Sequence, residues 1–86
     1  EPEPVELEFT PVVAPYILER TWHASQRVTS GQDGSLILKM AVCIDGALRS
    51  WILSFGSNVR VKSPKTLLEH IAADISRAQS YYIDQS

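Results

Sequence analysis

One short stretch of this sequence gathers side chains of several chemical types. Within eight residues it carries an acid, a guanidinium, an indole, an imidazole and neutral polar groups, and the candidates for binding are Arg20, Trp22, His23, Ser25 and Gln26. Such a set can hold a small anion or a nucleobase, but it equally suits a structural role or a contact with another protein. We favour the second interpretation, because indole rings are usually packed and polar strand residues usually face solvent or a partner.

The residues that catalysis or metal binding would need are scattered along the chain. A metal site needs three or four ligands, whereas the two histidines and the one cysteine stand far apart, at positions 23, 70 and 43. His70, beside Glu69, is interpreted as a solvated helix residue. Cys43 would need a nearby base to act as a nucleophile, and a small buried residue is the simpler interpretation. The sequence therefore predicts no enzyme, no metal and no cofactor.

Three basic residues, Arg60, Lys62 and Lys65, are candidate phosphate contacts. The topology inferred below places Glu6 and Glu8 beside the first two, so these charges are expected to be neutralised in cross-strand pairs. Charges on an edge strand also prevent edge-to-edge pairing of sheets. Paired surface charges are thus favoured, and direct binding of single-stranded nucleic acid, with a steep salt dependence, stays open as an alternative.

Length and composition indicate one small domain. The chain has 86 residues, 44% of them hydrophobic and 21% charged, which supports one modest core and excludes intrinsic disorder. The first ten residues carry four Glu and no base, whereas residues 11–86 carry eight bases and six acids, too small an excess to indicate nucleic acid. A lone cysteine and short apolar runs predict a cytoplasmic location and no membrane association.

Hydrophobic periodicity predicts where the elements lie. Alternating residues predict four strands, at 5–9, 21–29, 35–44 and 58–62. Helical spacing and capping signals predict three helices, at 12–19, 47–55 and 64–83. Thr10 and Ser63 are expected to cap the first and last helices, and Gly56 to end the middle one. The last helix is expected to bury Leu68, Ile71, Ala72, Ile75 and Tyr82.

This order predicts an α+β fold, a ferredoxin-like βαββαβ sandwich with an extra C-terminal helix. Its four antiparallel strands would lie in the order 4-1-3-2 with the helices on one face. Residues 1–4 are expected to be a linker from an earlier part of a longer protein, residues 5–83 the domain and residues 84–86 a tail. The helix-free face would collect mainly polar side chains: Glu6, Glu8, His23, Ser25, Arg27, Ile37, Lys39, Ala41, Arg60 and Lys62. It lacks the central aromatics on which RNA-binding domains of this topology stack bases.

Two motifs resemble a known family. The strings Trp22-His23-Ala24-Ser25-Gln26 and Trp51-Ile52-Leu53-Ser54-Phe55-Gly56 are similar to the C-terminal extension (WCX) domain of bacterial WYL-domain transcriptional regulators, and the resemblance covers about Val5 to Tyr82. It implies a ferredoxin-like domain without catalytic residues, which forms a homodimer and couples the effector state to DNA binding. The implied partners are the WYL and helix-turn-helix domains of the parent regulator, and DNA is contacted only through the latter.

Two questions stay open at this level. Other domains of this topology sense small effectors, such as nucleotides or amino acids, at the turn after the first strand, usually through a glycine. Thr10-Pro11 offers no glycine, and Pro11 lacks an N–H donor. The last helix either packs on its own sheet or is exchanged with a partner, and an exposed apolar patch at Trp22, Tyr81 or Tyr82 would serve a subunit contact.

Overall fold

The computed structural model describes residues 1–83, so the tail predicted at residues 84–86 lies outside the described residues. The elements follow one another as β1 (Glu3–Phe9), α1 (Ala14–Leu18), β2 (Arg27–Ser30), β3 (Leu36–Val42), α2 (Gly46–Leu53), a 3₁₀ turn η1 (Gly56–Asn58), β4 (Val59–Ser63) and α3 (Lys65–Ile83). This is the βαββαβ order predicted for a ferredoxin-like sandwich, followed by the additional helix.

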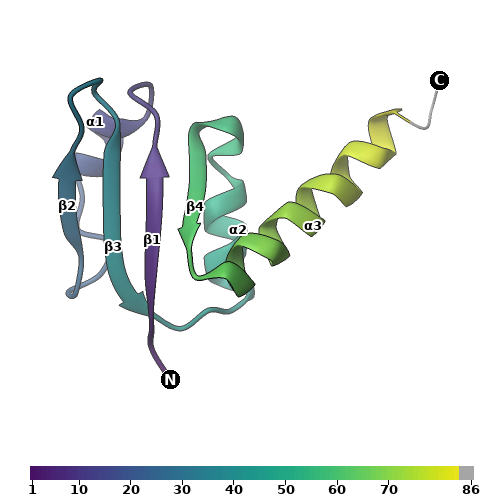
Figure 1. Ribbon diagram of the computed structural model, residues 1–86, viewed down its shortest axis with the longest axis horizontal. Helices are drawn as coiled ribbons and strands as arrows, with labels where there is room; N and C mark the ends of the chain where they lie inside the picture. The colour runs from purple at the N-terminus through teal and green to yellow at the C-terminus, as the bar shows by residue number, and fades with distance from the viewer. Residues whose placement is uncertain (84–86) are drawn as a thin grey trace.

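The four strands form one antiparallel sheet in the order β2-β3-β1-β4, the predicted order counted from the opposite edge. The helices α1 and α2 both lie behind this sheet, whereas α3 follows β4 and projects away from the sheet edge (Figure 1). The molecule is consequently elongated, with extents of 43 × 32 × 19 Å.

The central strands explain why the fold forms. In β1 the residues Val5, Leu7 and Phe9 are buried, and the intervening Glu6 and Glu8 face the other side, which is the alternation of a strand with one covered face. The strand begins two residues earlier than predicted, since it pairs with β3 from Glu3 onward. The buried core brings together residues from six elements: Val5, Leu7, Phe9, Ala14, Ile17, Leu36, Leu38, Met40, Ile52, Val61, Leu67 and Ile71.

Helix α1 is shorter than the predicted 12–19. The Thr10 hydroxyl donates to Oδ1 of Asn58 (2.8 Å), so it does not cap the helix as expected. Residues 11–13 instead form a turn, in which the Thr10 carbonyl accepts the N–H groups of Val13 and Ala14, and the helix begins at Ala14. The hydroxyl therefore ties the turn after β1 to the turn before β4.

Helix α2 begins at a side-chain cap. The Asp45 carboxylate accepts the backbone N–H of Leu48 (2.9 Å), and this satisfies one of the unpaired donors of the first turn. The helix ends at Leu53 with Ser54 as its C-cap, two residues before the predicted end, so Gly56 does not cap it as expected. Gly56 instead begins η1 with a φ of 57°, a left-handed conformation in which a side chain would be strained.

Helix α3 buries a different set of residues from the predicted one. Ile71 is buried as predicted and Leu67 is buried as well, whereas Ala72 is exposed, and Leu68, Ile75 and Tyr82 are 41%, 50% and 82% exposed. The helix packs on β4 only near its start, because the rest extends beyond the sheet edge (Figure 1). Ser63 ends β4, and the Pro64 carbonyl accepts the N–H of Leu68 (3.1 Å) in the first turn, so the expected cap at Ser63 is also wrong.

Candidate functional site

The predicted binding stretch forms a loop, which we call the Trp–His loop (residues 19–26), and the strand expected at 21–29 is reduced to Arg27–Ser30. The Gln26 side chain closes this loop. Its Oε1 accepts the backbone N–H groups of Trp22 and of His23 (3.1 Å for the latter), and its Nε2 donates to the Arg20 carbonyl (3.4 Å). One amide thus replaces the ladder hydrogen bonds that a strand would have made.

His23 and Ser25 bond to each other and to the edge of β3. Nδ1 of His23 lies 2.7 Å from the Ser25 hydroxyl and accepts the Ser25 backbone N–H (3.1 Å). The Ser25 oxygen accepts the backbone N–H of Ala41 (2.9 Å), and its hydroxyl lies 3.4 Å from the Ala41 carbonyl. The Ser25 side chain therefore bonds to the backbone of β3 beyond the end of β2, where a longer β2 would have paired. Ser25 lines a hollow of the open sheet face together with Arg27, as the alternation predicted, although it belongs to the loop and not to a strand.

The aromatic residues of the loop pack toward the helices. The Trp22 ring is half-buried, lies 5.1 Å from Trp51 and 5.6 Å from Tyr16, and its Nε1 donates to the Ile17 carbonyl (3.1 Å). The Arg20 guanidinium stacks over this pair, 4.9 Å from the Tyr16 ring and 5.8 Å from the Trp22 ring. Exposed cation–π contacts of this kind stabilise by about 0.5–1 kcal/mol. Trp22 and Trp51 thus anchor the loop against α1 and α2.

The predicted site residues are brought together, but they mostly bond to their own chain. The amide of Gln26, the hydroxyl of Ser25, Nδ1 of His23 and the indole N–H of Trp22 each have a partner within the loop or its neighbours. A ligand would have to compete with these bonds. The arrangement therefore holds a loop conformation, and the groups it turns outward are the Arg20 guanidinium and the exposed side of the His23 ring.

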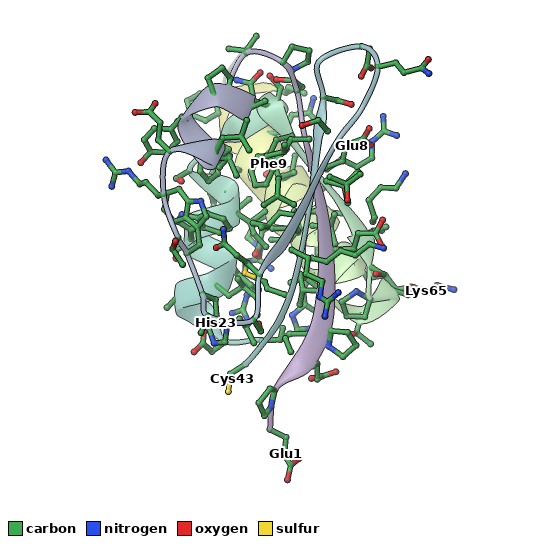
Figure 2. All side chains as sticks on the ribbon, turned by 90° about the vertical axis from the view of Figure 1, so that its left-hand side faces the viewer. Glu1, Glu8, Phe9, His23, Cys43 and Lys65 are labelled. Carbon is green, nitrogen blue, oxygen red and sulfur yellow. The ribbon has the colours of Figure 1, made fainter. Side chains whose placement is uncertain are left out.

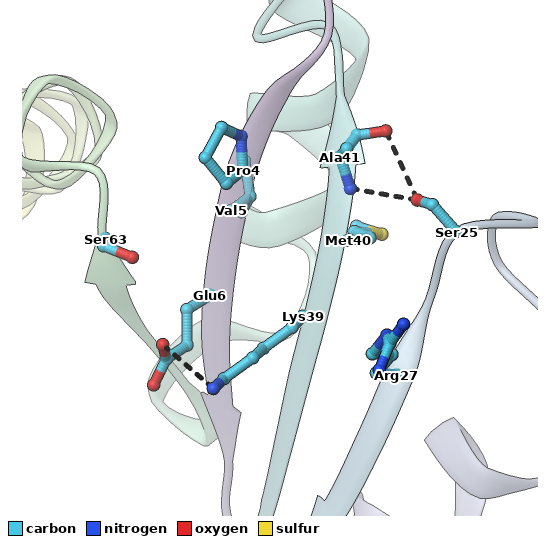
Figure 3. A pocket seen from close by; sticks show the side chains of 9 residues that line it. All are labelled: Pro4, Val5, Glu6, Ser25, Arg27, Lys39, Met40, Ala41 and Ser63. Atoms are coloured by element: carbon cyan, nitrogen blue, oxygen red, sulfur yellow. Dashed lines mark hydrogen bonds and ion pairs between the residues drawn. The ribbon is translucent and has the colours of Figure 1, made fainter.

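The open face of the sheet carries paired charges. Lys39 lies 4.0 Å from Glu6 (Figure 3). Lys62 lies 3.8 Å from Glu8, the neighbour that the topology predicted for it. Exposed ion pairs contribute about 0.2–1 kcal/mol each. Arg27 stands directly opposite Lys39 in the β2–β3 register, so one side of this face is locally basic. A shallow hollow of about 230 Å³ lies between these residues and Ser63.

The three candidate phosphate contacts do not make one cluster. Arg60 and Lys62 share the open face of β4, where Glu8 is the register partner of Arg60 and the ion-pair partner of Lys62. Lys65 begins α3, beyond the strand end, and points away from the sheet (Figure 2). Their charges are therefore divided between a neutralised strand face and a helix start.

A polar hollow of about 240 Å³ lies at the turn after β1, and the sequence did not indicate it. It joins the β1–α1 turn at Thr10, the hairpin at Asp33 and Ser35, the turn η1 at Ser57 and the start of β4 at Arg60. Hydrogen bonds from the Ser35 hydroxyl (2.6 Å) and backbone N–H (3.0 Å) lower the pKa of the Asp33 carboxyl. The hollow thus offers a carboxylate, a guanidinium and hydroxyls.

An apolar groove of about 640 Å³ is a second concavity that was not predicted from the sequence. It separates α3 from the end of α2 and the start of β4, and its apolar walls are Leu53, Val59, Ile75, Ala78 and Tyr82. The sequence did carry a signal, namely the seven-residue spacing of Leu68, Ile75 and Tyr82. The spacing predicts that these three side chains are part of the core, whereas they face solvent in the structure.

The histidines, the cysteine and the carboxylates of the described residues are spread over the molecule. No group of three or more His, Cys, Asp or Glu side chains is placed to hold a metal ion within residues 1–83. Cys43 is exposed just after β3, which corrects the prediction of a buried thiol, and it lies at the same end of the molecule as His23 (Figure 2). His70 is exposed on α3, as predicted. No helix in this range is long and apolar enough to cross a membrane.

A model of the WCX domain family matches residues 1–79, nearly the whole described chain. Among curated proteins, none shows significant similarity to this chain.

Proposed function

The chain belongs to the WCX domain family, a family of regulatory domains of WYL-type regulators, and on that premise we propose that it is a non-catalytic regulatory and dimerisation module. In this role it couples the effector state of the parent regulator to DNA binding. Its partners are a second subunit and the WYL and helix-turn-helix domains, and DNA is reached only through the helix-turn-helix domain. A regulator of this kind acts in the bacterial cytoplasm.

One observation carries the dimerisation proposal. Large apolar side chains on or beside α3 are at least one-third exposed, among them Leu53, Leu68, Ile75, Tyr81 and Tyr82. Apolar side chains gathered in this way mark contacts with another protein, because their burial on association removes apolar surface from water. Trp22, the other residue considered for a subunit contact, is half-buried against Tyr16 and Trp51 and adds little to such a surface.

Coupling to DNA binding follows from the geometry of a dimer. A regulator that binds DNA with two helix-turn-helix domains is sensitive to the spacing of its half-sites, which the subunit contact helps to set. An effector can shift DNA affinity only as far as it binds one arrangement of the subunits better than another. A rigid contact domain at the end of each subunit transmits that preference without any chemistry of its own.

The test has two parts. Sedimentation equilibrium of the 86-residue chain is expected to give a monomer–dimer equilibrium, and a chain that stays monomeric at millimolar concentration contradicts the dimerisation role. In the regulator that carries this domain, deletion of the domain is expected to remove the effector dependence of operator binding while leaving the isolated DNA-binding domain active. Unchanged effector dependence contradicts the coupling role.

A second candidate function is small-effector sensing, which the polar hollow after β1 favours. Arg60 supplies a cation, Asp33 an anion, and Ser35 and Ser57 supply hydroxyls, a set that suits a zwitterion such as an amino acid. Calorimetry against amino acids and nucleotides tests it. A binding heat that Arg60→Gln removes supports sensing at this hollow, and Arg27→Gln, an exposed arginine on β2, is the matched control. Loss with Arg20→Ala or His23→Ala instead places the effector on the Trp–His loop.

A further inference from the structure

The outer half of α3 (residues 75–83) lacks a covering layer in the described chain. Leu67 and Ile71 pack on the domain, but the same helical stripe continues through Ile75, Ala78 and Tyr82 beyond the sheet edge. These three residues form one wall of the apolar groove, and Leu53 and Val59 form the other. An amphipathic helix of 19 residues is thus covered over only part of its apolar stripe.

The exposed apolar residues of α3 before and after Ile75 are arranged symmetrically about it. Three residues before and after it stand Ala72 and Ala78, and seven residues before and after it stand Leu68 and Tyr82. All five of these side chains are exposed. If two such helices cross antiparallel at Ile75, large side chains meet large ones at the ends, and alanines meet alanines next to the centre. A contact between two copies related by a two-fold axis requires this kind of self-matching surface.

We propose that the groove is filled by α3 of a second copy of this chain, with the two-fold axis passing at Ile75. This inference rests on the proposed dimerisation and specifies its surface. Ile75 of one copy then contacts Ile75 of its partner, and Leu68 of each copy packs beside Tyr82 of the other. The two alanines let the helix axes approach closely, since interaxial distances of about 8–10 Å depend on the size of the side chains at the contact.

The charges of α3 favour a second copy. The helix carries two bases and two acids, so two copies do not repel each other. Among residues 1–83, Asp74 is the one charged residue that lines the groove, and it is paired with Arg49 (3.9 Å) and Arg77 (3.8 Å). The carboxylate is thereby neutralised at the rim of the groove. The apolar centre and charged rim match the usual anatomy of a subunit contact.

The available surface is sufficient for a weak dimer. The exposed parts of Leu53, Leu68, Ile75 and Tyr82 amount to roughly 450 Å² per copy, so a symmetric contact would bury about 900 Å² of these side chains in total, the size of a weak interface. The contact is therefore expected to be concentration-dependent in the isolated chain and to be strengthened by the rest of the regulator.

A charge at the proposed axis tests the contact. Ile75→Glu places two glutamates against each other in an apolar seam, and the dissociation constant of the dimer is expected to rise more than about 100-fold. The matched control is Val12→Glu, which makes the same change at a side chain that is 77% exposed on the turn before α1. The control is expected to leave the dimer unchanged, and equal melting temperatures at low concentration show that both variants fold.

Cross-linking tests the axis itself. In a Cys43→Ser background, Ile75→Cys is expected to form an intersubunit disulfide within minutes of mild oxidation, whereas Val12→Cys is not. A wild-type dimer that resists Ile75→Glu, or an Ile75→Cys chain that does not cross-link, overturns the α3 contact while dimerisation by another surface stands. A wild-type chain that is monomeric throughout overturns both.

Discussion

In the Trp–His loop the polar side chains bond to the chain itself, whereas in the outer half of α3 the apolar side chains face solvent. Gln26 and Ser25 satisfy backbone groups of Trp22, His23 and Ala41. Tyr82, by contrast, is 82% exposed on a helix that continues past its own sheet. The residues with versatile chemistry thus hold a local conformation, and the plain apolar residues form the surface suited to binding.

The difference shows how the two kinds of surface can be recognised. A polar side chain signals binding only when its donors and acceptors have no partner in the fold, because a bonded group must give up that bond to a ligand. An apolar side chain signals binding when it is exposed beside other apolar side chains, because the transfer of their combined surface out of water on binding lowers the free energy. Residue type alone does not show whether a polar side chain is already bonded or whether an apolar side chain is exposed.

The largest predicted effect compares two isoleucines one turn apart on α3. Ile71→Ala removes a side chain that is only 7% exposed, and the free energy of unfolding is expected to fall by about 2–4 kcal/mol. Ile75→Ala changes a half-exposed position and is expected to cost less than about 0.5 kcal/mol in the monomer. Urea denaturation at low concentration measures both. Equal losses would mean that the outer half of α3 is covered within a single chain.

An intermediate effect is predicted in the Trp–His loop. Gln26→Ala leaves the backbone N–H groups of Trp22 and His23 without their acceptor, and the free energy of unfolding is expected to fall by about 1–3 kcal/mol. Gln26→Glu keeps an acceptor oxygen and should recover part of the loss. Gln32→Ala, an exposed glutamine in the hairpin turn, is the control and should change little. If Gln26→Ala were equally harmless, the loop would not depend on its internal bonds.

The smallest effect concerns Asp33 in the β2–β3 hairpin, a third place where polar groups bond locally. The Ser35 hydroxyl and backbone N–H lower the pKa of Asp33 below its ordinary value of 3.8. Because the folded state binds the proton less readily, this contribution to stability is present above pH 3.8 and is lost as the pH falls through the lowered value. The melting temperature of the wild type relative to Asp33→Asn should therefore decline below about pH 4. With Ser35→Ala as the background, that decline should be weaker.

The strands and their faces could be predicted from the sequence, and the reason is local. Alternating residues in β1 and β3 place Val5, Leu7 and Leu38 on the core side whatever the rest of the chain does, because a strand has a period of two. The strand order and the Glu6–Lys39 and Glu8–Lys62 pairs followed from that alternation and the order of the elements. The existence of all three helices was predicted from another local pattern, the helical spacing of apolar residues.

The errors arose where a pattern had more than one physical solution. Trp22, Ala24 and Gln26 alternate like strand residues, but the Gln26 amide closes a loop that removes the strand. A helix with apolar residues on adjacent sides can bury either Leu67 or Leu68, and only contact with β4 decides between them. Among the candidate binding residues, the sequence identified which ones lie together, but it gave no sign that their polar atoms are already bonded.

The sequence by itself determined which faces of the strands are apolar, the order of the elements and the likeness to the WCX family, because each depends on neighbours along the chain. The tertiary structure alone decided which groups are occupied and which are exposed. The Ser25 hydroxyl meets Ala41 across 16 residues, and the Thr10 hydroxyl meets Asn58 across 48. The exposure of α3 depends on where the sheet ends beneath it. Hydrogen-bond partners and burial are set by residues that are distant in the chain, and no local pattern carries that information.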